Sequence, residues 1–130
     1  MTALDTRARE LAQAPNFATL SVILRSGRPM THVMWVDADD DYILINTEAH
    51  RAKFRAIERD PRVTVTVWQR DDPYTYAEVR GQVVATTRGR EARDHIDSLS
   101  RKYRGNDYDD SAITSERVIL RIAPETVRCH

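Results

Sequence analysis

The 130-residue chain has no excess of charge of either sign, because twenty lysines and arginines balance twenty aspartates and glutamates. Proteins that bind nucleic acids or membrane surfaces usually carry an excess of positive charge. The chain also lacks an apolar run long enough to cross a membrane. Neither a nucleic acid nor a membrane is therefore expected as a partner.

Cysteine is almost absent as well. Cys129 is the single cysteine, so no internal disulfide can form, which fits a reducing compartment. The first residues contain no apolar signal-peptide core, and a cytoplasmic location is expected. No spacing of histidine, cysteine and carboxylate residues resembles a zinc or iron site, and the acidic run at 37–41 lacks the calcium-loop pattern, so no metal is expected.

What the chain does contain is a series of short segments in which apolar and polar residues alternate, as in half-buried strands. Strands are predicted at 17–24, 30–36, 42–47, 62–69, 74–86 and 117–122, with a bulge or bend at Gly81, and helices at 4–13, 49–59 and 89–103. Many strands with few helices exclude a doubly wound fold and predict a mainly β (α+β) protein. The expected architecture is a six-stranded antiparallel barrel, closed or half-closed, with a short inserted helix and flanking helices. It forms one domain over residues 1–130.

A barrel of this size fills its interior with its own side chains. A ligand must then lie outside the barrel wall or at a subunit contact. A homodimer is expected, because a second copy would roof such a groove and cover the outer apolar face. The aromatic residues expected in the core or at this interface are Trp68, Tyr74 and Tyr76.

The helix predicted after the third strand begins with the cations Arg51 and Lys53. The positive end of the helix dipole normally favours acidic side chains, so cations are unusual there. Free N–H groups together with cationic side chains suit a phosphate. The alternative is a solvated helix face whose cations pair with Glu48, Glu58 or Asp60.

Three histidines invite a catalytic interpretation. His32 lies on a predicted strand, where it could donate a proton or hydrogen-bond a substrate carbonyl, although such a histidine is more often a satisfied polar residue. His50 is expected to be exposed at the start of the basic helix. His95 lies beside Asp94 and Asp97 in the last predicted helix, and a surface position is expected.

Several short motifs, in this order and spacing, resemble a known family. They are Phe17-Ala18-Thr19-Leu20, Gly27-Arg28-Pro29, Asn46-Thr47, Arg51-Ala52-Lys53, Asp60-Pro61-Arg62-Val63 and Tyr76-Ala77-Glu78-Val79-Arg80-Gly81. Nearly the whole chain resembles the pyridoxamine 5′-phosphate oxidase-like (PPOX-like) proteins, which have the FMN-binding split β-barrel fold. The Arg-Ala-Lys triplet ahead of Arg-Asp-Pro-Arg-Val looks most like the branch that uses the deazaflavin coenzyme F420.

The resemblance implies cofactor-binding positions. Basic residues at the start of the inserted helix hold the cofactor phosphate in this family, which maps onto Arg51 and Lys53, with Arg55 a weaker candidate. Thr47 ends the third strand, where the ring and the phosphate-bearing chain meet. The second strand lies along the tricyclic ring, and the positions nearest to it are Met30, Thr31, His32, Val33 and Met34. Trp68 and Gln69 are placed similarly and are expected to reach the cofactor of the partner subunit.

The function implied by the resemblance is that of an oxidoreductase. Reduced F420 delivers a hydride to an electron-poor conjugated small molecule, and the protein supplies position and electrostatics. Arg55 or Arg104 could meet the acidic oligoglutamate tail of the coenzyme. Three alternatives stay open: the same fold with FMN as cofactor, a non-catalytic carrier or regulator, and a barrel that has lost its ligand.

Overall fold

The computed structural model describes residues 4–130. Residues 1–3, which were included in the predicted domain, lie outside the described residues. They are also the start of the segment in which the sequence contains no signal-peptide core. The elements follow in the order α1 (Thr6–Gln13), β1 (Phe17–Ile23), β2 (Pro29–Trp35), β3 (Asp37–Ala38), β4 (Ile43–Glu48), α2 (Ala52–Arg59), β5 (Arg62–Gln69), β6 (Asp72–Thr87), α3 (Arg90–Arg104), the short 3-10 helix η1 (Asp110–Ala112) and β7 (Arg117–Cys129). None of the helices among residues 4–130 is long and apolar enough to span a membrane.

The strands form one antiparallel sheet in the order β2-β1-β5-β6-β7-β4-β3. The sheet curls so that β2 approaches β4, although in the described chain β2 is hydrogen-bonded only to β1. The barrel is therefore open along a seam between β2 and β4. The predicted mainly β, antiparallel architecture with three α-helices is confirmed.

The expected count of six strands is not confirmed, because the sheet has seven strands within residues 4–130. The additional strand, β3, has two residues that pair with Ile43 and Leu44, and it lies in the acidic run between two predicted strands. The turn itself is shorter than the acidic run. The Asp39 carboxylate accepts hydrogen bonds from the backbone N–H groups of Asp41 and Tyr42 at 2.9 and 2.8 Å, which leaves the preceding residues free to pair.

The last strand also differs from its prediction, since β7 continues past residue 122 to Cys129. Pro124 looks like a strand end in the sequence because proline cannot donate a ladder hydrogen bond. In the fold it lies opposite Gly81, at a shift of register between β6 and β7. The bulge or bend predicted at Gly81 is thus confirmed, and it is what accommodates the proline.

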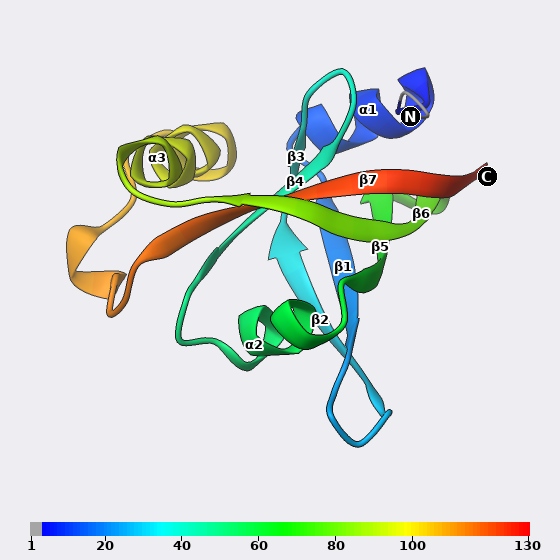
Figure 1. Ribbon diagram of the computed structural model, residues 1–130. Helices are drawn as coiled ribbons and strands as arrows, with labels where there is room; N and C mark the ends of the chain where they lie inside the picture. The colour runs from blue at the N-terminus through cyan, green and yellow to red at the C-terminus, as the bar shows by residue number, and fades with distance from the viewer. Residues whose placement is uncertain (1–3) are drawn as a thin grey trace.

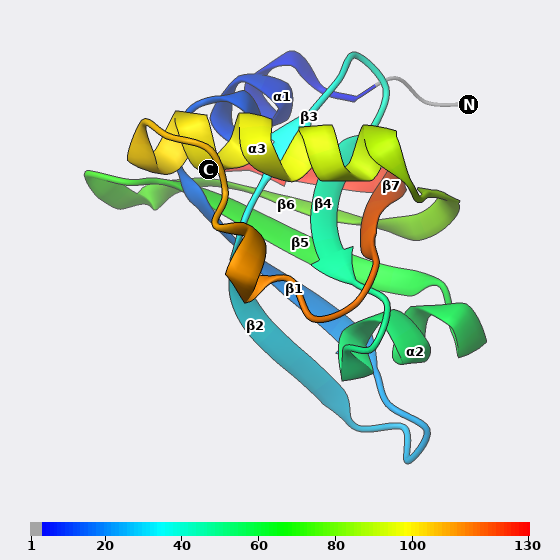
Figure 2. The same cartoon turned by 90° about the vertical axis from the view of Figure 1, so that its left-hand side faces the viewer.

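Two helices close the ends of the curled sheet (Figures 1 and 2). α1 contributes Ala8, Leu11 and Ala12 to the main core, and α2 contributes Phe54 and Ile57 to the same cluster. α3 packs outside the sheet, where Ala92, Leu44 and Ile119 form a second, smaller cluster. Helix α2 is thereby fixed against the core through Phe54 in its first turn and Ile57 in its second.

Gly81→Ala is expected to destabilise the fold by about 1–3 kcal/mol, the usual cost of overpacking. A Cβ at this position would lie 2.0 Å from the carbonyl oxygen of Ala123, which belongs to the β7 backbone and cannot rotate away. The measurement is the free energy of unfolding in urea. Gly105→Ala is the control, because a Cβ there meets open space and the change costs only the left-handed backbone, about 1 kcal/mol. Equal losses in the two variants would contradict the close approach at Gly81.

Candidate anion and cofactor site

The basic helix begins at Ala52, three residues later than predicted, and Arg51 is its N-cap. The chain turns before it, where the Arg51 N–H donates to the Glu48 carbonyl at 3.1 Å and the Ala49 N–H donates to the Glu116 carbonyl at 2.9 Å. The cap residue accepts no side-chain hydrogen bond from the helix, and the first turn contains no acidic residue. The first N–H groups of α2 are therefore left for an external acceptor.

Glu48, at the end of β4, is the carboxylate at the centre of the site and is only 1% exposed. One of its oxygens accepts hydrogen bonds from the backbone N–H groups of Thr114 and Ser115 at 2.7 and 3.0 Å. The other lies 3.7 Å from Arg51 Nη2 and 3.8 Å from Arg117 Nη1. Burial would raise the pKa of Glu48, but the two backbone hydrogen bonds and the charge of Arg117 outweigh it and hold the pKa below its ordinary value. Glu48 is thus ionised at neutral pH.

Lys53 is the cation of the site whose charge is least neutralised by nearby carboxylates. Its side chain is half-buried, and within residues 4–130 it has no ion pair and no hydrogen bond. Burial lowers the pKa of Lys53, and the charges of Arg51 and Arg117 lower it further. Arg51 and Arg117 therefore share the carboxylate of Glu48, and Lys53 adds a third positive charge without a carboxylate partner among the described residues. An anion would relieve this repulsion.

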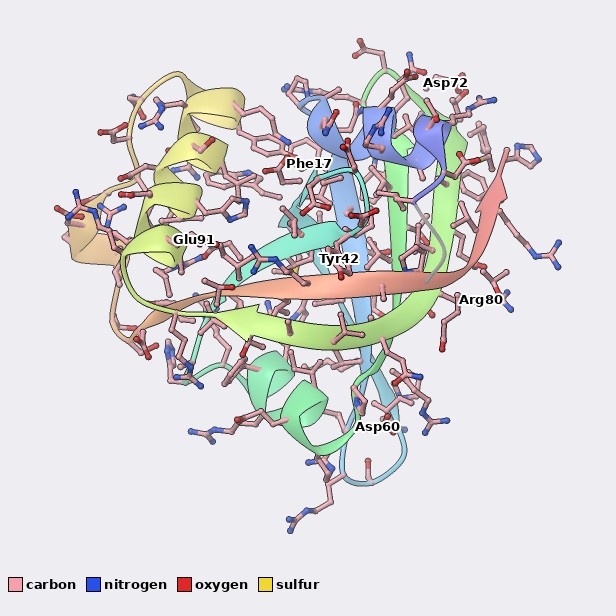
Figure 3. All side chains as sticks on the ribbon, turned by 45° about the horizontal axis from the view of Figure 1, so that its top comes forward. Phe17, Tyr42, Asp60, Asp72, Arg80 and Glu91 are labelled. Carbon is pink, nitrogen blue, oxygen red and sulfur yellow. The ribbon has the colours of Figure 1, made fainter. Side chains whose placement is uncertain are left out.

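The alternative reading of the basic helix, as a face paired with its own carboxylates, holds only in part. Arg51 does approach Glu48, but that carboxylate is shared with Arg117. Asp60 instead binds Arg62 at 2.7 Å. Figure 3 labels Asp60 at the end of α2 opposite its N-terminus, too far along the helix to neutralise the first turn. The positive charge at the start of α2 is left in excess.

Arg117 is the functional candidate that sequence reasoning missed. The β4–β7 register places it directly opposite Glu48, although the two are far apart in the chain. Its Nε donates to Asn46 Oδ1 at 2.8 Å, and its guanidinium carbon lies 5.4 Å from the centre of the Tyr108 ring. The side chain is buried, which lowers the pKa of Arg117. No local sequence signal marks this arginine, because only strand pairing brings it to the site.

The positions predicted to lie along the cofactor ring are all on β2, at the seam. Met30, His32 and Met34 pair with Val22, Leu20 and Ala18, so they share the inner side of the sheet, and both methionines pack against the core. Thr31 and Val33 are on the outer side. Val33 is 64% exposed, and the Thr31 hydroxyl hydrogen-bonds that of Ser21 at 2.7 Å. An exposed strand edge with an apolar inner side is thus available beside the seam.

Of the remaining predicted positions, Trp68 and Gln69 lie apart from the cations, whereas Thr47 is next to Glu48. Thr47 is buried on β4 opposite Val118. Trp68 and Gln69 are at the end of β5 far from α2, and Gln69 lines a cavity of about 810 Å³ between α1 and the β5–β6 turn. This cavity has both acidic and basic walls and is separate from the cation cluster. Within one chain the structure does not bring Trp68 and Gln69 to the phosphate candidates.

The other residues named in the sequence analysis have the following positions in the structure. Arg55 is exposed on α2 and has no ion pair within residues 4–130. Arg104 lies over the Trp35 ring at 5.0 Å, and the exposed His50 hydrogen-bonds the Ser115 hydroxyl. Tyr74 is 81% exposed, so the expectation of a core position does not apply to it.

The expected surface position of His95 is wrong. Its side chain is 11% exposed and binds Asp37 and Asn46, each at 3.1 Å. The surface position was inferred from the neighbouring Asp94 and Asp97. These two aspartates pair with Arg90 and Arg93 on the same helix and do not determine which way His95 faces. A helical residue three positions after the buried Ala92 faces the sheet, and this spacing was the signal available.

Comparisons with known proteins agree with this architecture. The family model described as pyridoxamine 5′-phosphate oxidase matches residues 4–130. Among solved structures, an F420 reductase is 26% identical with a TM-score of 0.83, over 96% of this chain and 98% of that one. No curated protein is similar enough to count as a match.

Two more distant structures show the same fold. A conserved hypothetical protein from Mycobacterium tuberculosis is 24% identical with a TM-score of 0.73, over 98% of this chain and 84% of that one. General stress protein 26 from Bacillus anthracis is 20% identical with a TM-score of 0.63, over 93% and 88% of the two chains. The resemblance read from the motifs is confirmed, and the chain belongs to the pyridoxamine 5′-phosphate oxidase family.

Proposed function

We propose that this protein is an oxidoreductase that binds reduced coenzyme F420 and transfers a hydride to an electron-poor conjugated small molecule. The observation that carries the proposal is the half-buried, unpaired Lys53 beside Arg51 and Arg117, at a helix start with unused N–H groups. Such a site suits a phosphate. The 26% identity to an F420 reductase over nearly the full length of both chains supports this cofactor in preference to FMN.

The residues present fit a phosphate-bearing planar cofactor. Arg51, Lys53 and the first-turn N–H groups of α2 would bind the phosphate, and the edge of β2 would support the ring. Bound F420 in its reduced form supplies the hydride. The chain's own contribution is to orient the ring beside the seam and to neutralise the phosphate charge. A proton for the product would come from solvent or from His32, which is exposed on β2.

A homodimer is part of the proposal. The outer side of β2 presents Val33, and Trp68 on β5 lies on the same side of the sheet, since both strands pair with β1 through outward-facing residues. A second copy packed on this side would shield Val33 from water. It would also allow Trp68 and Gln69 to approach the cofactor of the partner, which they do not approach in their own chain.

The first test is a side-by-side titration of the purified protein with F420 and FMN, followed by cofactor fluorescence. Tight, saturable binding of F420 with much weaker binding of FMN is expected. A preference for FMN would change the proposed cofactor and keep the cation site, and binding of neither would overturn the proposal. Oxidation of bound reduced F420 only when a conjugated substrate is added would separate an enzyme from a carrier.

A further inference from the structure

A chain of buried polar side chains leads from the outer helix α3 to Arg117. His95 Nε2 lies 3.1 Å from Asp37 Oδ2 on β3, and His95 Nδ1 lies 3.1 Å from Asn46 Nδ2 on β4. Asn46 Oδ1 in turn accepts the Arg117 Nε–H at 2.8 Å. Three strands and one helix therefore meet in a single hydrogen-bonded series, which the proposed cofactor chemistry does not use.

The direction of each hydrogen bond follows from the chemistry of its ends. An arginine can only donate, so the Asn46 oxygen must face Arg117 and its NH₂ group must face away. That NH₂ group donates to the Ala92 carbonyl at 3.0 Å and to His95 Nδ1. His95 Nδ1 must then be an unprotonated acceptor, and Nε2–H donates to Asp37. The arrangement requires a neutral His95.

We propose that His95 is a positioning residue for the anion site, and that its neutral form holds Arg117, through Asn46, in the orientation that binds the anion. This inference rests on the proposed phosphate site. It extends that site by naming Arg117 as a third cation and His95 as the residue that fixes the orientation of Arg117. The distance from Arg117 Nη1 to Glu48, 3.8 Å, is longer than a hydrogen bond, so the terminal nitrogens keep donors for a ligand.

Protonation of His95 would break the series. A proton on Nδ1 would oppose the Asn46 NH₂ group, and turning the amide would place that NH₂ group against the Arg117 Nε–H and its oxygen against the Ala92 carbonyl. Arg117 would lose its buried hydrogen bond and its fixed orientation. Anion affinity should therefore fall as the pH is lowered, whereas protonation of Lys53 alone would raise it.

The charged groups around His95 are of both signs. Asp37 faces it from β3, while Lys102 on α3 acts on Asp37 and Arg117 lies beyond Asn46 on β7. Burial would raise the pKa of Asp37, but its hydrogen bonds to His95 and to the Ala38 N–H hold it below its ordinary value. Asp37 is thus a carboxylate at neutral and mildly acidic pH, where it accepts the His95 Nε2–H.

The experiment is calorimetric titration of the full chain with F420 at a series of pH values between about 7.5 and about 5.5, the range of histidine titration. We expect wild-type affinity to fall by about tenfold over this range, the loss of one charge-assisted contact. His95→Gln keeps a donor and an acceptor but cannot be protonated, so its affinity should not show this fall. His50→Gln, near the site but outside the series, should leave the fall unchanged.

A second readout needs no ligand. The NMR resonance of the Arg117 Nε–H should move with the titration of His95 in the wild type and stay constant in His95→Gln. Identical pH profiles in wild type and His95→Gln, or an Arg117 resonance that ignores His95, would overturn the inference. Failure of the wild type to bind F420 at every pH, with the Arg117 resonance still following His95, would instead count against the proposed cofactor alone.

Discussion

Replacing Arg51 and Lys53 together by glutamine is expected to weaken F420 binding at least about a hundredfold, because each charge-assisted contact to a phosphate contributes about 1.5–3 kcal/mol. Both side chains lie at the start of α2, where Arg51 is half-exposed and Lys53 has no carboxylate of its own within residues 4–130. Neither substitution opens the core, and removal of Lys53 relieves repulsion from Arg51 and Arg117. The measurement is the dissociation constant of F420 by fluorescence titration.

Arg59→Gln is the matched control for the double variant. Arg59 is exposed on the same helix and carries the same charge, but it lies in the last turn of α2, at the end opposite Arg51 and Lys53. Its replacement should change the dissociation constant by less than about threefold, since an exposed charge is screened by solvent. An unchanged affinity in the double variant, with an intact fold by circular dichroism, would remove the phosphate site from α2.

Glu48→Gln is expected to lower the free energy of unfolding by about 3 kcal/mol, because removing one partner of a buried ion pair leaves a buried charge without compensation. Arg117 would lose its carboxylate, and the backbone N–H groups of Thr114 and Ser115 would keep only a neutral acceptor. The measurement is urea unfolding at neutral pH. In Glu116→Gln, which breaks an exposed pair with Arg88, the loss should stay below about 1 kcal/mol.

The same variant tests the acid dependence of stability. The pKa of Glu48 is lowered in the fold, so its contribution is fully present above its ordinary value of 4.5 and disappears as the pH falls through the folded-state value. Wild type and Glu48→Gln should therefore converge in stability toward low pH. A difference that stays constant down to about pH 2 would show that the ionisation of Glu48 does not stabilise the fold.

Much of the fold could be predicted from the sequence because alternation of valine and threonine sets strand positions directly, as in β5, which has its predicted bounds. The errors lie where a tertiary contact overrides a local signal. The last strand was predicted to end at residue 122, but β7 continues to Cys129 because the bulge at Gly81 accommodates Pro124. Residues 37 and 38 were predicted to lie outside the strands, but they pair with β4. The single-domain extent, the cytoplasmic location and the dimer stay predictions.

The candidate site was only half visible in the sequence. Arg51 and Lys53 lie two positions apart at the start of one helix and stand out against the usual acidic start. Arg117 and His95 become relevant only through the pairing of β4 with β7 and the packing of α3, which residue spacing along the chain does not encode. The cations at a helix start can be identified from the sequence alone. Whether carboxylates neutralise them depends on strands that pair only in the folded protein.

The seam between β2 and β4 has a mechanical consequence. The cations belong to the side of the seam formed by β4, β7 and α2, whereas the ring-supporting edge belongs to the hairpin of β1 and β2. A cofactor bound to both sides would link β2 to β4, two strands that are not hydrogen-bonded to each other in the described chain. After its release β2 would be held to the sheet only through β1, which stays paired with β5. Occupancy of the site and rigidity of the β2 edge would therefore rise and fall together.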